Sequence, residues 1–346
     1  MALNTTASFP VTEGTQVAEP RRAIQTLASQ LAFSDERTGR AALIVSELAT
    51  NLAKHAKQGE VLLRPLQSPH GQLQGIEVVA LDKGPGIPDE ARSRRDGFST
   101  SGTLGHGLGA IERQADSIDI YSQPTGTIIA ARIWRERALA DEIGESRLEV
   151  GAVRVSKTGE SVCGDICGWR IRPGRLAIFV ADGLGHGVPA FEAASAGLAV
   201  FGTSHESNPS RLIEDVHGAL RPTRGAAVAT AAIDLERGTV AYAGLGNIAG
   251  AILLAAGGRH SMVSHNGTAG HAAGRIQEFN YPMPSGAILV MCSDGLLSQW
   301  DLTAYPGIRT RSATIIAAAL YRDYSRRRDD ATVVVVKDRP AFTEKL

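Results

Sequence analysis

Four aspartates in the second half of the sequence stand where predicted apolar strands begin or end, and together they could bind metal ions. These residues are Asp165, Asp182, Asp294 and Asp329. Hard divalent cations such as Mg²⁺ and Mn²⁺ bind several carboxylate oxygens that converge from different strands. Each aspartate alone is also explained as a turn residue, because Asp-Gly after a strand is a frequent turn signal. The four together predict a metal site.

Metal ions held there would activate water, so no serine or cysteine nucleophile is needed. Two Mg²⁺ or Mn²⁺ ions could hold a hydroxide, lower its pKa and stabilise its in-line attack on a phosphate monoester. His186 follows Asp182 in a glycine-rich loop and is either an acid or an exposed residue outside the metal shell. Cys163 and Cys167 flank Asp165, but two thiolates without a matching second pair do not make a zinc site.

In the first half, Glu47, Asn51 and His55 are spaced four apart on a predicted helix and therefore share one face. A carboxylate and an amide in that arrangement could serve a Mg²⁺ ion and an attacking hydroxyl group. The alternative is a solvated polar stripe on the helix surface, which the spacing alone does not exclude.

Two glycine-containing segments follow this helix. Asp82 ends an apolar strand, where it could accept the adenine amino group, while Gly84 and Gly86 let the backbone approach a ligand or simply form a turn. A second run precedes a short helix and could cradle phosphates with its backbone N–H groups. Its candidate cofactor-binding residues are Gly102, Thr103, Gly105, His106, Gly107, Leu108 and Gly109. The three segments in this order predict a nucleotide site.

Hydrophobic periodicity predicts the elements that position these residues in the first half. Helices are expected over residues 17–31 and 36–56, followed by strands over 60–66 and 72–81. A short helix ending near Ala115 and a hairpin of residues 117–122 and 126–134 complete the segment. This order predicts an α/β sandwich with helices on one face of a sheet.

The second half is expected to contain mainly strands. Residues 148–156 and 160–170 are predicted to form a hairpin. Further strands are expected over 175–181, 226–235, 239–243, 249–254, 287–292 and 331–337, with helices over 188–201, 209–220 and 311–324. Such a pattern is typical of two packed sheets flanked by helices. The predicted divisions of this two-domain α/β chain are 1–138, a linker at 139–147, 148–338, and a tail at 339–346.

Composition excludes several functional classes. The chain has 36 Lys and Arg residues against 36 Asp and Glu residues, so there is no basic footprint for nucleic acid. No apolar run approaches the roughly 20 residues that a membrane helix needs. Three cysteines do not make a disulfide framework, and the N-terminus lacks a signal-peptide pattern, so a cytoplasmic protein is expected.

Residues 11–134 resemble the GHKL ATPase superfamily, and within it the small switch and anti-sigma serine kinases of the RsbT and RsbW type. The resemblance is carried by residues 46–56 (SELATNLAKHA), 82–88 (DKGPGIP) and 102–110 (GTLGHGLGA), and residues 96–100 look like a short ATP lid. It implies the Bergerat α/β sandwich and the cofactors ATP and Mg²⁺. By this resemblance Glu47 would be the general base on a protein serine, Asn51 the Mg²⁺ ligand and Asp82 the adenine contact.

Residues 148–337 resemble the SpoIIE branch of the PP2C phosphatases, particularly its RsbX-type members. The resemblance rests on residues 182–187 (DGLGHG), 244–248 (GLGNI) and 265–270 (HNGTAG). It implies an α-β-β-α sandwich in which catalytic Asp182 bridges two metals near the Gly183 carbonyl. Asp294 and Asp329 would complete the ligands of one metal, and Asp165 would contact the other, directly or through water. Gly168 stands where many relatives carry another acid, which disfavours a third metal.

Together the resemblances imply a bifunctional regulator that phosphorylates and dephosphorylates a serine on a STAS-type antagonist in stressosome or partner-switching signalling. Two alternatives remain open. The first domain could instead bind ATP only to form complexes, sequestering a sigma factor or activating another phosphatase. It could also be a nucleotide sensor that gates the attached phosphatase.

Overall fold

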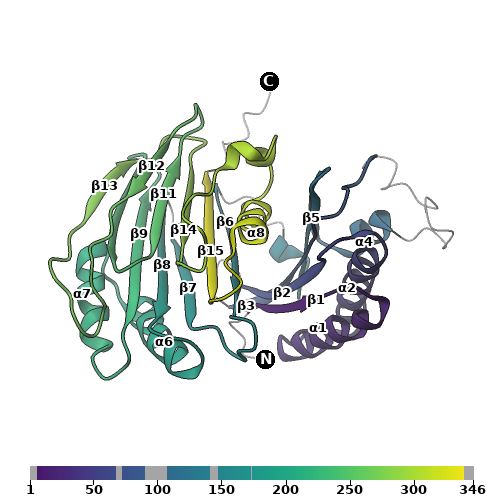
Figure 1. The fold of residues 1–346 in the computed structure, drawn as a ribbon, viewed down its shortest axis with the longest axis horizontal. Helices are drawn as coiled ribbons and strands as arrows, with labels where there is room; N and C mark the ends of the chain where they lie inside the picture. The colour runs from purple at the N-terminus through teal and green to yellow at the C-terminus, as the bar shows by residue number, and fades with distance from the viewer. Residues whose placement is uncertain (1–5, 68–71, 90–106, 141–146, 173, 339–346) are drawn as a thin grey trace. The chain divides into compact units, whose positions relative to one another are not determined.

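The computed structural model describes residues 6–67, 72–89, 107–140, 147–172 and 174–338 (Figure 1). The chain forms two compact units, and each is made of two stretches of sequence. Unit 1 comprises Met1–Ser146 and Tyr305–Arg322, and unit 2 comprises Arg147–Ala304 and Asp323–Leu346. The boundary between Ser146 and Arg147 lies within the linker predicted at 139–147, and Tyr305–Arg322 is a second stretch that belongs to unit 1. In the described part of the chain, no helix is both long and apolar enough to cross a membrane.

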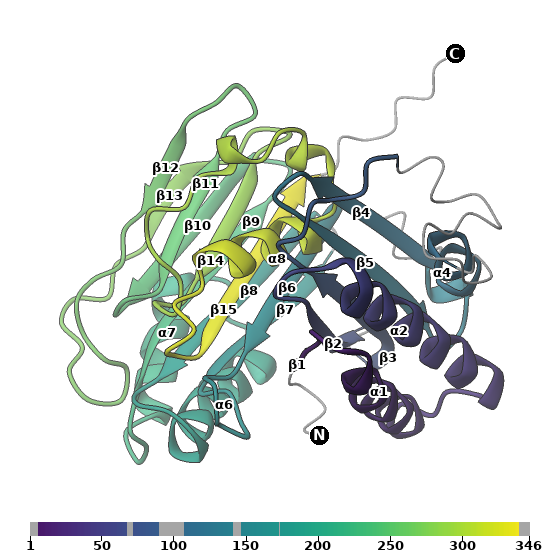
Figure 2. The same cartoon turned by 45° about the vertical axis from the view of Figure 1, so that its right-hand side comes forward.

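Unit 1 contains a five-stranded antiparallel sheet of order β1-β2-β3-β5-β4. Its strands are β1 (Ala7–Pro10), β2 (Glu60–Gln67), β3 (Leu73–Leu81), β4 (Ser117–Gln123) and β5 (Gly126–Trp134). Helices α1 (Ala18–Gln30) and α2 (Asp35–His55) cover one face, as Figure 2 shows, and α4 (Leu108–Gln114) lies beside α2. This confirms the predicted α/β sandwich.

The core of this sandwich follows from the spacing of apolar residues. On α2, Ile44 and Leu48 are fully buried one turn apart, and on β2 the alternate residues Val61 and Leu63 point to the same core. Ser34 caps the start of α2, where its hydroxyl accepts a hydrogen bond from the backbone N–H of Arg37. The cap and the buried stripe explain why this helix forms and which face it presents to the sheet.

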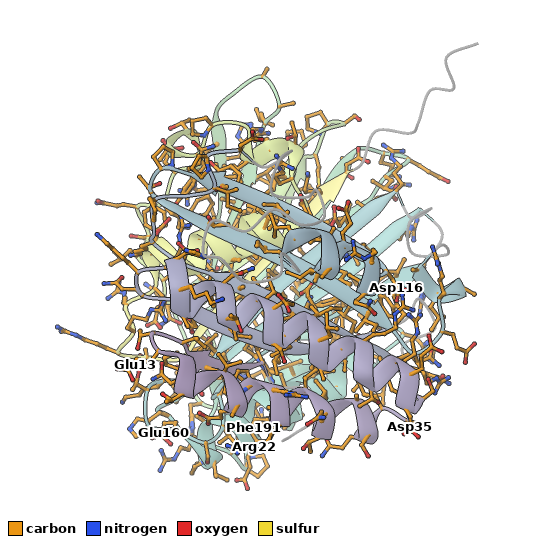
Figure 3. All side chains as sticks on the ribbon, turned by 90° about the vertical axis from the view of Figure 1, so that its right-hand side faces the viewer. Glu13, Arg22, Asp35, Asp116, Glu160 and Phe191 are labelled. Carbon is orange, nitrogen blue, oxygen red and sulfur yellow. The ribbon has the colours of Figure 1, made fainter. Side chains whose placement is uncertain are left out.

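A buried ion pair ties α2 to the sheet. The Arg37 guanidinium lies 3.0 Å from Oδ1 of Asp116, the residue labelled in Figure 3. The other carboxylate oxygen of Asp116 accepts a hydrogen bond from the Trp134 backbone at 2.7 Å. Both ionic side chains are almost entirely buried, so loss of either partner would leave an unpaired charge. This contact joins the first turn of the helix that carries Glu47 and Asn51 to the residue before β4.

The opposite face of the same sheet carries charged side chains among buried apolar ones such as Leu62 and Val79, and α8 (Ala313–Tyr324) bonds to it. Glu77 on β3 receives hydrogen bonds from Arg64, Arg132 and the Thr314 hydroxyl of α8. Burial alone would raise the pKa of Glu77, but the two guanidinium groups reverse that effect and lower it to about 2. The helix predicted at 311–324 is present as α8, and its residues up to Arg322 belong to unit 1.

Unit 2 contains two five-stranded antiparallel sheets, of order β13-β10-β9-β8-β7 and β12-β11-β14-β15-β6. The strands of the first are β7 (Asp165–Arg172), β8 (Arg175–Gly183), β9 (Ala226–Asp234), β10 (Thr239–Leu245) and β13 (Phe279–Pro282). Those of the second are β6 (Leu148–Val155), β11 (Ala249–Leu253), β12 (Arg259–Met262), β14 (Ile288–Cys292) and β15 (Ala331–Asp338). Helices α6 (Val188–Thr203) and α7 (Pro209–Ala219) pack on the first sheet (Figure 1).

The alternating burial of the strands explains this layering. On β8, Ile178 and Val180 belong to the core shared by the two sheets, while Phe179 and Ala181 face α6 and α7. A strand buried on both faces reads as a continuous apolar run, which is the pattern of residues 175–181.

The predicted hairpin of residues 148–156 and 160–170 is wrong. Strand β6 pairs with β15, from Leu148 opposite Asp338 to Val155 opposite Ala331, and β7 pairs with β8. Sequence proximity favours a hairpin, but here the short connection crosses from one sheet to the other. Strands β12 and β13 were not predicted, because both are short edge strands with mostly exposed or half-buried side chains.

Candidate metal and nucleotide sites

Asp165 and Asp182 face each other across two paired strands. Asp182 lies near the end of β8, Asp165 begins β7, and the antiparallel register places the two residues directly opposite. Directly opposed residues of an antiparallel pair project to the same face with Cβ atoms about 5 Å apart. The residue after Asp182 must be glycine, because a Cβ on Gly183 would lie 2.0 Å from the carbonyl oxygen of Ala190 on α6. Two predicted ligands are thus held together by backbone pairing.

Asp165 is fully buried and one of its oxygens lacks a protein partner. Its Oδ2 accepts a hydrogen bond from the Ser293 hydroxyl at 2.6 Å. Its Oδ1 is buried and has no hydrogen-bond partner among the described residues. A buried carboxylate oxygen without a donor is costly. Ligation of a divalent cation would remove that cost, so the residue fits a metal ligand.

The electrostatics link all four predicted aspartates. Burial raises the pKa of Asp182, and the charges of Asp165, Asp294 and Asp329 raise it further. Burial also raises the pKa of Asp165. Carboxylates in one site disfavour ionisation of each other, whereas a divalent cation favours the ionised forms. The site is therefore arranged for positive charge.

The carboxylates do not form a closed set. In the described ranges, no group of three or more His, Cys, Asp or Glu side chains is close enough to hold a metal ion. Asp294 accepts a hydrogen bond from the Asn247 side chain at 2.7 Å, and Asp329 is exposed. The assignment of Asp165, Asp182, Asp294 and Asp329 as ligands accordingly stays a prediction.

Metal binding at neutral pH is expected to release protons. The raised pKa values mean that folded, metal-free protein holds protons on Asp165 and Asp182 that an ordinary aspartate has lost above about pH 4. Because the folded protein binds these protons more tightly than the unfolded chain does, they stabilise the metal-free protein at low pH. This stabilisation is lost as the pH rises through the raised pKa values of the two aspartates. Calorimetric Mn²⁺ titration in buffers of different ionisation enthalpy measures the release. Asp182→Asn should reduce it, and equal release by both proteins would contradict the arrangement.

Asp330 has a structural role that the sequence did not reveal. Its two carboxylate oxygens accept hydrogen bonds from the backbone N–H groups of Lys157, at 2.7 Å, and Gly164, at 2.8 Å. The residue is buried, and these bonds fix the chain that leads from β6 to Asp165. The only available signal was the doublet of residues 329 and 330, which does not say which aspartate turns inward.

Asp330→Asn is expected to destabilise the protein by about 2–4 kcal/mol. The asparagine amide would place an NH₂ group against one of the two buried N–H donors, and hydrogen bonds to charged groups contribute about 1.5–3 kcal/mol each. Urea unfolding in EDTA measures the change. Asp329→Asn is the matched control, because Asp329 is exposed and its replacement should shift stability by less than about 0.5 kcal/mol. Equal effects of the two substitutions would contradict the role of Asp330.

His186 and Cys163 do not complete the metal site. His186 is exposed, and its Nδ1 lies 2.6 Å from Glu160 Oε1, which favours the interpretation as a residue outside the metal shell. Cys163 is buried, and burial raises the pKa of its thiol well above the usual range. A protonated thiol is a poor zinc ligand. The zinc alternative therefore gains no support.

The candidate nucleotide residues in unit 1 lie on α2 and after β3. Glu47 and Asn51 are half-buried and His55 is exposed at the end of the helix. Asp82 is buried, and its Oδ1 accepts a hydrogen bond from the Gly84 backbone at 2.5 Å. Burial raises the pKa of Asp82, while this bond, one from Thr127 and the charge of Arg322 oppose the rise.

Gly86 is required by the turn after Asp82. Its φ of +80° lies in the left-handed region, and a Cβ there would lie 2.3 Å from the Gln123 carbonyl oxygen. Gly107 precedes α4, and Leu108 and Gly109 form its first turn. The other predicted residues of this loop, Gly102, Thr103, Gly105 and His106, and the lid at 96–100 lie outside the described residues.

Both halves of the chain match known families. Residues 9–133 match the histidine kinase-like ATPase domain, and residues 172–339 match stage II sporulation protein E (SpoIIE). With the observed folds, these matches define a two-part chain that joins a GHKL-type ATPase domain to a SpoIIE-type domain with the PP2C fold. The serine/threonine-protein kinase RsbT of Bacillus subtilis (strain 168) is 34% identical over 119 residues, which cover 34% of this chain and 88% of RsbT. Through its N-terminal part, the chain belongs to the RsbT family.

Solved structures were also similar. One, from work on the bacterial stressosome as a modular system adapted to control secondary messenger signalling, has a TM-score of 0.52 and 28% identity and covers 56% of this chain and 100% of its own. A crystal structure of RsbX with magnesium has a TM-score of 0.48 and 24% identity, over 55% of this chain and 94% of its own.

Proposed function

We propose that unit 2 is a metal-dependent protein-serine phosphatase. The residues that would hold the divalent ions are Asp165, Asp182, the Gly183 carbonyl, Asp294 and Asp329. Bound Mg²⁺ or Mn²⁺ would supply a hydroxide at neutral pH and neutralise charge on the phosphate. The observation that carries the proposal is the register that sets Asp165 opposite Asp182, combined with the unsatisfied buried oxygen of Asp165.

The surrounding residues would orient these ligands. The Ser293 hydroxyl donates a hydrogen bond to Oδ2 of Asp165. Because this bond orients the carboxylate group, it also sets the direction of Oδ1. The Asn247 amide holds one oxygen of Asp294, and Asp330 fixes the backbone before Asp165. Partners of this kind set the direction and basicity of metal-bound carboxylates. The residues 244–248 singled out in the sequence would act in this way through Asn247.

We propose for unit 1 a protein-serine kinase activity that uses ATP and Mg²⁺. Asn51 would bind the metal ion, Asp82 the adenine, and Glu47 would accept the proton of the attacking serine hydroxyl. Gly84 and Gly86 and residues 102–109 would lie along the nucleotide. Phosphoryl transfer requires mainly positioning and charge neutralisation, so these few groups suffice. The 34% identity to RsbT, a serine/threonine-protein kinase, supports this part.

The proposed substrate of both activities is a serine on a STAS-domain antagonist protein in the cytoplasm. The similarity to RsbT and to a structure from work on the bacterial stressosome supports this class of partner. The test incubates the purified chain with a STAS-domain protein and radiolabelled ATP, and separately incubates the phosphorylated partner with Mn²⁺, Mg²⁺ or EDTA. Incorporation with ATP and release only with metal would support the proposal. Release in EDTA would contradict the phosphatase mechanism.

A second candidate function is nucleotide sensing, and the position of α8 favours it. This helix comes between Asp294 and Asp329 in the sequence, yet it completes the unit that carries the nucleotide residues. ATP bound there would be linked through the chain to residues proposed to bind metal. The measurement is phosphate release with and without a non-hydrolysable ATP analogue, where an unchanged rate would exclude sensing. A binding module for a sigma factor would instead retain that protein in a pull-down and transfer no phosphate.

A further inference from the structure

Helix α8 bonds to the face of the unit 1 sheet that lies opposite α1 and α2, from the residue before its start to Arg322. At its start, the Ser312 backbone donates a hydrogen bond to Asp119 at 2.6 Å, and the Thr314 hydroxyl donates to Glu77 at 2.8 Å. Two turns later, the Tyr321 hydroxyl donates to Glu60 at 2.9 Å. Thr314 and Tyr321 are seven residues apart and therefore share a face. The helix is held in one register over the sheet.

Arg322 makes the last of these contacts between α8 and the rest of unit 1. The Arg322 guanidinium is buried, and its Nη1 donates a hydrogen bond to the backbone carbonyl of Asp82 at 3.0 Å. The same nitrogen would lie 2.6 Å from a Cβ placed on Gly126, so the absence of a side chain there admits the guanidinium. A buried cation is thereby placed against the backbone of the residue proposed to bind adenine.

The carboxylate of Asp82 is oriented as well as placed. Its Oδ1 is occupied by the backbone N–H groups of Gly84, at 2.5 Å, and Thr127, at 3.4 Å. Neither of these bonds involves Oδ2, and Oδ2 is not among the fully buried oxygens that lack a partner in the described residues. Two backbone amides thus hold Oδ1, and Arg322 holds the main-chain carbonyl of the same residue.

We propose that Arg322 is a positioning residue for the nucleotide site, which directs Asp82 toward the amino group of an adenine base. The proposal rests on the function proposed for unit 1. An ionised carboxylate accepts a hydrogen bond from the adenine amino group and repels the carbonyl oxygen that guanine presents at the same place. A nearby cation favours the ionised form of a buried carboxylate. Arg322 therefore contributes to affinity for ATP and to its discrimination from GTP.

The test measures dissociation constants of Mg·ATP and Mg·GTP for the full chain and three variants. Arg322→Met removes the charge and keeps the aliphatic stem, and Arg322→Lys keeps a cation that can reach the carbonyl. Arg311→Met is the matched control, because Arg311 precedes the same helix and bonds at 3.4 Å to Asp119, which pairs with Ala130 and, among the described residues, makes no contact with Asp82. Circular dichroism and thermal melting establish folding of each protein.

Arg322→Met is expected to raise the ATP dissociation constant about tenfold or more, as loss of a charged hydrogen bond does, and to lower the ratio of GTP to ATP constants. Arg322→Lys should recover most of the affinity for ATP and most of the GTP-to-ATP ratio. Arg311→Met should keep both dissociation constants within about twofold of wild type. An unfolded fraction reduces the number of sites and leaves the ratio unchanged, so the ratio separates positioning from instability.

Unchanged affinity and ratio in Arg322→Met would overturn the inference and leave the proposed function standing. Equal losses in Arg322→Met and Arg311→Met would also overturn it, because they would indicate a general effect of α8. Absence of ATP binding by the wild-type chain would overturn the proposed nucleotide site and the inference with it.

Discussion

Replacement of Asp182 by asparagine is expected to reduce Mn²⁺-dependent release of phosphate from a phosphoserine protein by about a thousandfold. Metal activation of water and of the phosphate contributes several kcal/mol to the barrier, and each 1.36 kcal/mol is a factor of about ten in rate. Asp182 is the proposed ligand whose pKa is raised by all three other aspartates, so it lies where their charges meet. Loss of this carboxylate should therefore affect both metal positions.

The same substitution should not unfold the protein. Asparagine has the shape of aspartate and removes a charge that Asp165, Asp294 and Asp329 repel. The metal-free variant should thus melt at the wild-type temperature or above it. Asp215→Asn, an exposed change on α7, is the control and should retain full activity. Wild-type phosphate release by Asp182→Asn, measured with malachite green at saturating Mn²⁺, would refute the metal assignment.

Replacement of Glu47 by glutamine is expected to slow phosphorylation of the partner serine by about a hundredfold to ten-thousandfold, the usual contribution of a general base. Affinity for ATP should change by less than about twofold, because glutamine has the same shape and Glu47 is not proposed to contact the nucleotide. The pairing of low transfer with unchanged binding distinguishes a base from a binding residue.

This measurement needs a second substitution in the background. If both activities act on one serine, phosphate added by unit 1 is removed by unit 2, and net incorporation understates the transfer rate. Transfer is therefore measured in Asp182→Asn protein with and without Glu47→Gln. Glu36→Gln is the matched control, because Glu36 is an exposed carboxylate in the first turn of the same helix. Transfer that persists without Glu47 would remove it from the mechanism.

Most elements and the order of the candidate site residues could be predicted from the sequence, because they depend on local patterns. The helical spacing of Leu48 and Leu52 and the short apolar run of β2 are properties of short segments, and they predicted α2 and the strand that follows it. Asp82, Asp182 and Asp294 were found by the change from an apolar run to an acid and a glycine. Such a change marks a strand end whatever the strand pairs with.

Residues whose roles depend on distant partners could not be predicted in this way. Ser293 contacts Asp165 across 128 positions of sequence, and Asp330 contacts Gly164 across 166. Neither residue differs from an ordinary turn residue in its local pattern. Their roles appear only when β14 and β15 bring them beside the start of β7, and the same dependence explains the wrong hairpin of β6 and β7.

The sequence by itself determined that this chain has two α/β parts, one with the residues of an RsbT-type ATPase and one with four strand-end aspartates. Tertiary structure alone decided that Asp165 stands opposite Asp182, that Asp330 rather than Asp329 turns inward, and that α8 belongs with unit 1. The physical reason is that strand ends and helix faces are set by neighbours in the chain. Pairing register, buried charge and the partners of buried polar side chains are set by contacts between segments far apart in the sequence.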